Sequence, residues 1–262
     1  MNTIINKIYS EYLMPSRLGM YDSFLLQALN SGYLQTSVRT YFKSMRGSEY
    51  CNKKIIVHRH DIDSDVRTAR KLFEIEKKYN IKSSYYFRKA TLDYKFMREI
   101  EEYGSEASYH YEEIATFAKK NHIKDPIEIR KHLPEIRNNF LVNFTSIEEQ
   151  LGRKIITVAS HGDFANRRLK LINHEILDDQ KLRECCGIEC ESYDLTLLNN
   201  FDIYISDRPH PQYYYPISPF DAIGRHNKIC LLTHPVQWET NWIESTKSNL
   251  VRLYEELNWQ LT

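Results

Sequence analysis

Hydrophobic and polar positions alternate regularly after about residue 48 of this 262-residue chain. Short apolar runs of strand length are followed by segments whose apolar residues recur at helical spacing, which is typical of a mainly parallel α/β fold. The runs are KIIVHR, SSYYFR, EASYH and KIITVAS, then GIECES, FDIYISDR and KICLLTHP. We predict a strand at each run, within one α/β domain of residues 49–262 that carries an irregular or helical leader of residues 1–48.

Helix boundaries are visible in the same pattern. The helix after the first strand is expected to begin at Ser64 or Asp65, because either side chain can accept the free backbone N–H groups of a first turn. A second helix is expected to end at Gly104, which adopts a left-handed conformation without strain. A last amphipathic helix is predicted over about residues 243–257.

Ionisable side chains stand at the carboxyl ends of most of these runs. The segment HRHDIDSD follows the apolar IIV directly, and FR, YH, SHGD, SDR and THP end later runs. Half of the ten histidines fall there: His58, His60, His110, His161 and His234. Because the carboxyl ends of parallel strands face one crevice, we expect these side chains to converge on one pocket.

Asp and His side chains in one pocket form a ligand set that suits Zn²⁺ or a related divalent ion. One carboxylate and two imidazoles would leave positions for water and substrate. Such an ion lowers the pKa of bound water towards ~7 and polarises a carbonyl, which is the basis of amide or ester hydrolysis. A second carboxylate can act as base and a further histidine as acid. Ser64 or Asp65 already serves the helix, so Asp61 and Asp63 remain for this chemistry.

Four other side chains are candidates for substrate binding. Arg59, Arg88 and Arg208 each stand at a strand end and have the planar fork that binds a carboxylate or phosphate, although structural ion pairs are an equal alternative. Trp238, four residues after His234, is either a wall against a sugar ring or a core residue.

Composition excludes several partners. Lys and Arg number 36 against 35 Asp and Glu, so no charge excess directs the chain to nucleic acid or an anionic membrane. No stretch approaches the ~20 apolar residues of a membrane span, and the N-terminus lacks the pattern of a signal peptide. The five cysteines match no zinc or redox spacing and are expected as reduced thiols. We therefore expect a cytoplasmic protein.

Four segments together resemble a known family. They are, in order, IVHRHDIDSDVRTARKLFEIEKKYNIKSSYYFR, GSEASYHYEE, ASHGD and LLTHPVQW. In order and spacing they resemble the polysaccharide deacetylase superfamily, carbohydrate esterases that include the chitooligosaccharide deacetylases. The likeness covers about residues 50–258 and is nearest to the branch associated with bacterial surface-polysaccharide biosynthesis, which has a His-Asp-x-Asp first motif and a Thr-His-Pro late motif.

The resemblance implies an irregular (β/α) barrel with fewer than eight strands and one divalent metal ion, most simply Zn²⁺. By position it implies Asp61 as catalytic base, Asp63 as metal ligand, His110 as the first metal histidine and His234 as general acid. The implied activity is hydrolysis of the amide C–N bond of an acylamino sugar, with a saccharide or nucleotide-sugar as substrate, in O-antigen, lipopolysaccharide or capsule assembly.

The chain departs from the family at the second metal histidine. That residue lies four positions after the first, where this chain has Ile114. We expect His161, from the neighbouring strand end, to complete the metal site. The departure leaves two alternatives open: metal-dependent cyclisation or acyl or formyl transfer on a sugar, and a non-catalytic saccharide-binding barrel.

Overall fold

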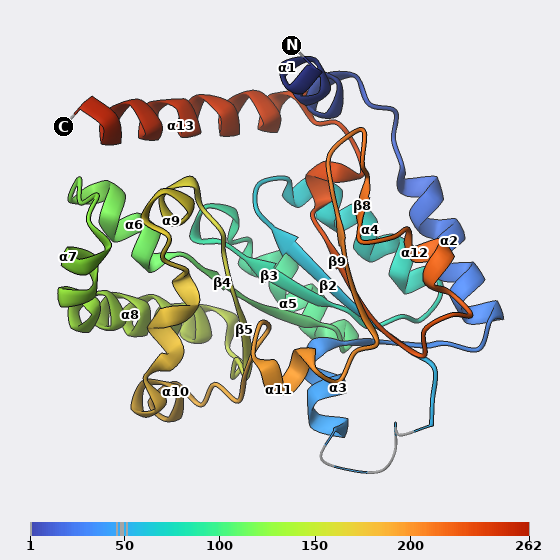
Figure 1. The fold of residues 1–262 in the computed structure, drawn as a ribbon. Coiled ribbons are helices and arrows are strands. Elements are labelled where there is room, and N and C mark those ends of the chain that lie inside the picture. The colour runs from blue at the N-terminus through green and yellow to red at the C-terminus, as the bar shows by residue number, and fades with distance from the viewer. Residues whose placement is uncertain (1, 46, 48–49, 51, 262) are drawn as a thin grey trace.

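The computed structural model describes all residues except 1, 46, 48–49, 51 and 262, and within them nine strands form one sheet (Figure 1). The strands follow the order β6-β5-β4-β3-β2-β9-β7-β8, with β1 paired to β2 beside this path. Their bounds are Leu34–Ser37 (β1), Ile55–Ile62 (β2), Ser84–Phe87 (β3), Glu106–Tyr111 (β4), Thr157–Ser160 (β5), Cys190–Glu191 (β6), Ile203–Asp207 (β7), Tyr214–Tyr215 (β8) and Lys228–Thr233 (β9).

The longest strand, β2, lies at the centre of the sheet. Residues 55–58 pair with β1 and residues 59–62 with β3, while β9 pairs with residues 55–60 along the other edge. Every pairing is parallel except that of β7 with β8. The carboxyl ends of the parallel strands therefore meet at one edge of the sheet, where open α/β folds bind their ligands.

Helices cover the outer face of this sheet (Figure 1). The helices of the first half are α1 (Asn2–Ile8), α2 (Leu18–Asn30), α3 (Val38–Ser44), α4 (Val66–Lys78), α5 (Tyr94–Tyr103), α6 (Glu113–Lys120) and α7 (Pro126–Lys131). Those of the second half are α8 (Leu133–Leu151), α9 (Phe164–Leu169), α10 (Gln180–Cys186), α11 (Leu195–Leu198), α12 (Pro219–Ala222) and α13 (Trp242–Leu261).

The sheet is curled but open. Val57 of β2, Tyr86 of β3, Ala159 of β5 and Cys190 of β6 belong to one buried cluster, although β2 and β6 lie four strands apart in the sheet order. Only a sheet that curls on itself brings them together. In the described residues the path ends at β6 and β8, and nine strands replace the expected fewer than eight. The α/β fold is thus confirmed as a curled half-barrel. The strand number was wrong because β1 and the two-residue strand β8, neither of which has an apolar run of its own, join the seven predicted strands.

The segment expected as a leader contributes to this sheet. Residues 34–37 form β1, which pairs with the first half of β2. The LQTS sequence of β1 has no apolar run, so its pairing is set by its neighbour rather than by its own pattern. The proposed division at residue 48 falls among residues outside the described part of the chain.

The first predicted strand, KIIVHR, continues further than expected, through Asp61 to Ile62. Its polar residues remain buried because each finds a partner inside the protein: Arg59 pairs with Asp61, and His60 contacts Glu76 of α4. Polar side chains that form hydrogen bonds with one another can be buried in a strand. The end of the apolar run therefore does not mark the end of such a strand in the sequence.

Both predicted helix boundaries are confirmed. The Asp65 side chain accepts the backbone N–H of Thr68 at the start of α4, and Gly104 ends α5 with φ of +90°. None of the helices in the described residues has the length and apolarity needed to cross a bilayer. Cys185, Cys186, Cys190 and Cys230 carry free thiols, and Cys51 lies outside the described residues.

Candidate active site

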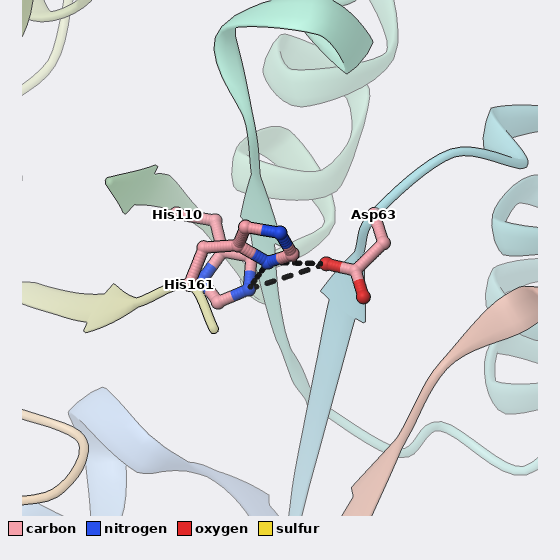
Figure 2. A group of neighbouring side chains, drawn as sticks. All are labelled: Asp63, His110 and His161. Atoms are coloured by element: carbon pink, nitrogen blue, oxygen red, sulfur yellow. Dashed lines mark hydrogen bonds and ion pairs between the residues drawn. The ribbon is translucent and has the colours of Figure 1, made fainter. Parts of the chain in front are cut away.

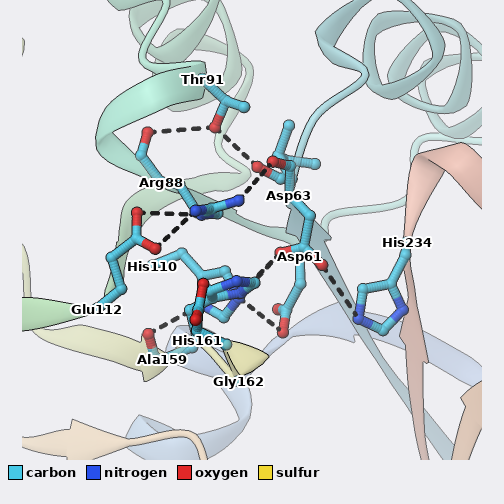
Figure 3. A network of polar contacts seen from close by, with 12 residues as sticks. Asp61, Asp63, Arg88, Thr91, His110, Glu112, Ala159, His161, Gly162 and His234 are labelled. Carbon is cyan, nitrogen blue, oxygen red and sulfur yellow. Dashed lines mark hydrogen bonds and ion pairs between the residues drawn. The ribbon is translucent and has the colours of Figure 1, made fainter. Parts of the chain in front are cut away.

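The carboxyl edge of the sheet brings five of the predicted residues together (Figure 3). Asp61 lies in β2 and Asp63 just beyond its end, His110 lies in β4, and His161 and His234 follow the last residues of β5 and β9. The five residues span 173 positions of the sequence, from Asp61 to His234, yet a chain of contacts of 4.0 Å or less connects them all. The parallel register of β2, β4, β5 and β9 places them there.

Asp63, His110 and His161 form the centre of this site (Figure 2). The Asp63 Oδ1 atom lies 3.3 Å from His110 Nε2 and 3.1 Å from His161 Nδ1. The two ring nitrogens are 3.3 Å apart. The three atoms form a nearly equilateral triangle of one anionic oxygen and two imidazole nitrogens.

Hydrogen bonds hold the His110 imidazole and the main chain of His161. His110 Nδ1 donates to the Ala159 carbonyl oxygen at 2.9 Å. In the neutral ring this leaves the lone pair on Nε2, which faces Asp63. The backbone of His161 is held twice, since its N–H donates to the Tyr111 carbonyl and its own carbonyl accepts from Asn173. The contact of His110 Nδ1, the ring nitrogen that faces away from Asp63, is of the kind by which proteins orient a metal-binding histidine.

This donor set fits a divalent metal ion. Asp63 Oδ1 is buried and has no hydrogen-bond partner, although two nitrogens lie close to it. An unpartnered buried carboxylate oxygen is costly unless a cation neutralises it. Metal–nitrogen bonds of about 2.0–2.1 Å at tetrahedral angles separate the ligand atoms by about 3.3 Å. The three sides of the triangle, 3.1, 3.3 and 3.3 Å, match that separation.

Asp61 is held by an arginine of its own strand. Arg59 donates from Nε to Oδ1 and from Nη2 to Oδ2, both at 2.8 Å, and both side chains are almost completely buried. Burial favours the neutral carboxyl, but the Arg59 guanidinium outweighs it and lowers the pKa of Asp61 below its usual value. Asp61 Oδ2 also lies 3.4 Å from His110 Nε2, so an ionised carboxylate faces the centre of the site.

His234 stands on the other side of Asp63, with its Nε2 4.0 Å from Asp63 Oδ2 (Figure 3). Asp207 holds this imidazole: its Oδ1 accepts from Nδ1 at 2.7 Å and its Oδ2 accepts from the His234 backbone at 2.7 Å. Burial disfavours the charged ring, but the carboxylates, Asp207 first among them, raise the pKa of His234 to about 9. The imidazole is therefore charged at neutral pH and directs Nε2–H towards the site.

Arg88 borders the site but is already paired. Its Nε and Nη2 atoms donate to the Glu112 carboxylate at 3.1 and 2.6 Å, and its Nη1 donates to the Asp63 carbonyl at 3.2 Å. The guanidinium thus supports the backbone of Asp63 (Figure 3). It also lines the cavity in front of Asp63 and His161.

The other three predicted substrate-binding residues lie elsewhere. Arg59 is 1% exposed and is occupied by Asp61, so it is a buried partner and not a substrate ligand. Trp238 is also 1% exposed, packs on Tyr21 and donates from its indole to Asp207 Oδ2, which makes it a core residue. Arg208 is exposed, stacks over Tyr215 and is not among the residues that line the cavity.

The structure adds two features that the sequence did not single out. Asp207 holds both the imidazole and the backbone of His234; its only sequence signal was its position at the end of a predicted strand. A cavity of about 780 Å³ opens in front of Asp63 and His161, and α13 forms its far wall. Ile114, at the position of the missing family histidine, is fully buried in the hydrophobic core.

Comparisons with known proteins give a distant likeness. No protein-family model and no curated protein matches this chain. Two solved structures that it resembles are those of a CE4 family pseudoenzyme from Bacillus anthracis and of a mutant of that pseudoenzyme with restored enzymatic activity. The wild type is 16% identical with a TM-score of 0.39 over 78% of this chain, and the mutant 16% identical with a TM-score of 0.40 over 77%. The alignments span 62% and 64% of those longer chains, less than two thirds of their length.

Proposed function

We propose that this protein is a metal-dependent hydrolase that removes the acyl group from the amide nitrogen of an acylamino sugar, as a step in bacterial surface-polysaccharide assembly. The observation that carries the proposal is the buried, unpartnered Asp63 Oδ1 atom, with His110 Nε2 and His161 Nδ1 3.3 and 3.1 Å away. The family resemblance of the sequence motifs supplies the substrate class.

Asp63, His110 and His161 would hold the ion, and the mixed oxygen and nitrogen donors favour Zn²⁺. When bound, such an ion lowers the pKa of a water molecule and polarises the acyl carbonyl. Three protein ligands leave room for both, as in other catalytic zinc sites. His161 thereby takes the place of the histidine that the chain lacks at Ile114.

The remaining polar residues have distinct tasks. Asp61, kept ionised by Arg59, accepts a proton from the water that adds to the acyl carbon. His234, charged and oriented by Asp207, donates the proton on Nε2 to the sugar nitrogen as the C–N bond breaks. The products are a carboxylic acid and an amino sugar, so water supplies all the atoms added.

Metal analysis of purified protein tests the ligand set. We expect about one divalent ion per chain, and its loss in both His110→Ala and His161→Ala. His174→Ala is the matched control. His174 lies in a second acidic cluster with Glu191 and Asp194, but Arg183 already forms two hydrogen bonds with Asp194 there, at 2.7 and 2.8 Å. The control should retain its ion, and a parent protein with no bound ion after dialysis against Zn²⁺ contradicts the proposal.

Product analysis tests the reaction. With N-acetylated amino sugars and their oligosaccharides as substrates, we expect acetate release that a chelator abolishes and added Zn²⁺ restores. Mass spectrometry should show loss of the acyl group from the sugar. Loss of water with the acyl group retained would instead indicate cyclisation, and metal binding without any change to the sugars would argue against hydrolysis.

A further inference from the structure

The cavity at the candidate active site has two walls of different origin. Its inner wall belongs to the carboxyl edge of the sheet and includes Asp63 and His161. Its outer wall belongs to α13, which crosses above that edge (Figure 1). The volume of about 780 Å³ lies in the range of ligand pockets, so the cavity accommodates more than the acyl group at the metal centre.

Contacts along its length fix α13 to the rest of the molecule. Just before the helix, Asn241 donates to Asp65 Oδ1 at 2.9 Å. Further along, Lys119 donates to Glu255 Oε2 at 2.8 Å, and near the end Trp259 is 3% exposed against an aromatic ring of α9. The helix is thus a built wall of the cavity and not a free extension.

Two apolar side chains of α13 line the cavity while remaining open to water. Tyr254 is 70% exposed and Val251 52% exposed, and both belong to the lining. An exposed aromatic ring beside a cavity has an unused apolar face, which complements the C–H face of a pyranose. Leu253, on the same helix and 54% exposed, is not part of the lining.

We propose that Tyr254, with Val251 beside it, is a sugar-stacking platform that binds a saccharide unit adjoining the one whose acyl group reaches Asp63 and His161. The inference rests on the proposed function, because it takes the ligand to be a saccharide. It makes the substrate an oligosaccharide rather than a single sugar, since the platform and the metal centre lie on opposite walls of the same cavity.

Binding to the chelated, full-length protein tests the platform without any catalysis. The probes are the β-1,4-linked tetrasaccharide of N-acetylglucosamine and the monosaccharide, measured by isothermal titration calorimetry. We expect the parent protein to bind the tetrasaccharide more tightly than the monosaccharide. Tyr254→Ala should raise the Kd of the tetrasaccharide by roughly three- to tenfold, while Tyr254→Phe, which keeps the ring, should not.

Leu253→Ala is the matched control and should leave the Kd unchanged, with circular dichroism confirming that all three variants keep their helix content. Equal Kd values for Tyr254→Ala and the parent, or no tetrasaccharide binding by the parent, would overturn the inference. If acetate is released from oligosaccharides but Tyr254→Ala changes neither Kd nor KM, the proposed function stands and the platform does not. A Tyr254-dependent Kd in a protein that never releases acid supports the platform and contradicts hydrolysis.

Discussion

At the scale of single residues, successive side chains of β2 face two polar surroundings. His58 and His60 contact residues of α2 and α4 behind the sheet, among them Tyr21 and Glu76. Arg59 and Asp61 pair with each other on the opposite face, towards the site. Polar groups excluded from water cost little only when they are paired. Each of these side chains therefore depends on a particular partner.

Removing Arg59 tests that dependence. In Arg59→Met the Asp61 carboxylate stays buried without its cation, so we expect the free energy of unfolding to fall by roughly 3–5 kcal/mol. Adding Asp61→Leu removes the uncompensated charge and should recover most of the loss. Urea unfolding followed by circular dichroism measures both variants. A single variant within about 1 kcal/mol of the parent would show that the pair contributes little.

Asp207 connects His234, the proposed general acid, to the core. Its Oδ2 accepts both the His234 backbone N–H, at 2.7 Å, and the Trp238 indole N–H, at 2.9 Å. In Asp207→Asn the NH₂ group replaces one of the two carboxylate oxygens. It cannot accept a hydrogen bond, so either the His234 ring N–H or the two donors to Oδ2 lose their acceptor. We expect unfolding to become easier by about 1–3 kcal/mol, together with a fall in kcat because His234 loses its orientation. Unchanged unfolding and kcat would contradict this role.

At the scale of elements, the sequence predicted strands wherever an apolar run was present. The runs that became β2, β3, β4, β5, β6, β7 and β9 all appear in the structure. It did not predict β1 or β8, since LQTS and the two residues of β8 obtain their strand character from pairing with a neighbour. The same reasoning located the candidate site, because strand ends converge whatever the helices between them do. It did not locate the wall formed by α13, which depends on where a helix packs after the last strand.

Asp65 connects the start of α4 to the residue before α13, so its replacement tests how α13 is held against the rest of the molecule. Its side chain accepts from the Thr68 backbone at the start of α4 and from Asn241, just before α13. Asp65→Ala removes a helix cap and leaves the Asn241 amide without this acceptor. We expect a loss of about 1–2 kcal/mol in unfolding free energy. Hydrogen exchange should also show faster opening of α13 than in the control Asp125→Ala, which removes only the cap of α7. If the amides of α13 exchange equally fast in both variants, the contact between Asp65 and Asn241 does not stabilise the packing of α13.

At the scale of the whole molecule, the buried groups behind β2 set the response to acid. Burial lowers the pKa of His58 to about 4, although the nearby Glu76 carboxylate acts in the opposite direction and raises it. The titratable groups near His58 are Tyr21 of α2, Glu76 of α4 and His60 of β2, and its Nε2 lies 2.8 Å from the amide oxygen of Gln35 in β1. Burial works against ionisation of Glu76, but His60 lowers its pKa to about 2. Both shifts reduce the number of protons that the folded state binds, so both make acid destabilising.

The two shifts act in different pH windows. An unfolded histidine gains its proton below a pH of about 6.5, whereas folded His58 remains neutral until about pH 4. Unfolding free energy should therefore fall by up to about 1.4 kcal/mol per pH unit across this window, about 3 kcal/mol in all. The Glu76 contribution is present above a pH of about 4.3 and is lost only as the pH falls further towards 2.

Unfolding by urea at several pH values between 7 and 4 measures the His58 contribution. His58→Gln cannot take up the proton in either state, so its unfolding free energy should fall less steeply between pH 6.5 and 4 than that of the parent. His132→Gln, at a partly exposed position on the surface, is the control and should keep the slope of the parent. Equal slopes in parent and His58→Gln would mean that His58 takes up its proton within the folded protein. The buried polar network behind β2 would then not be the source of acid sensitivity.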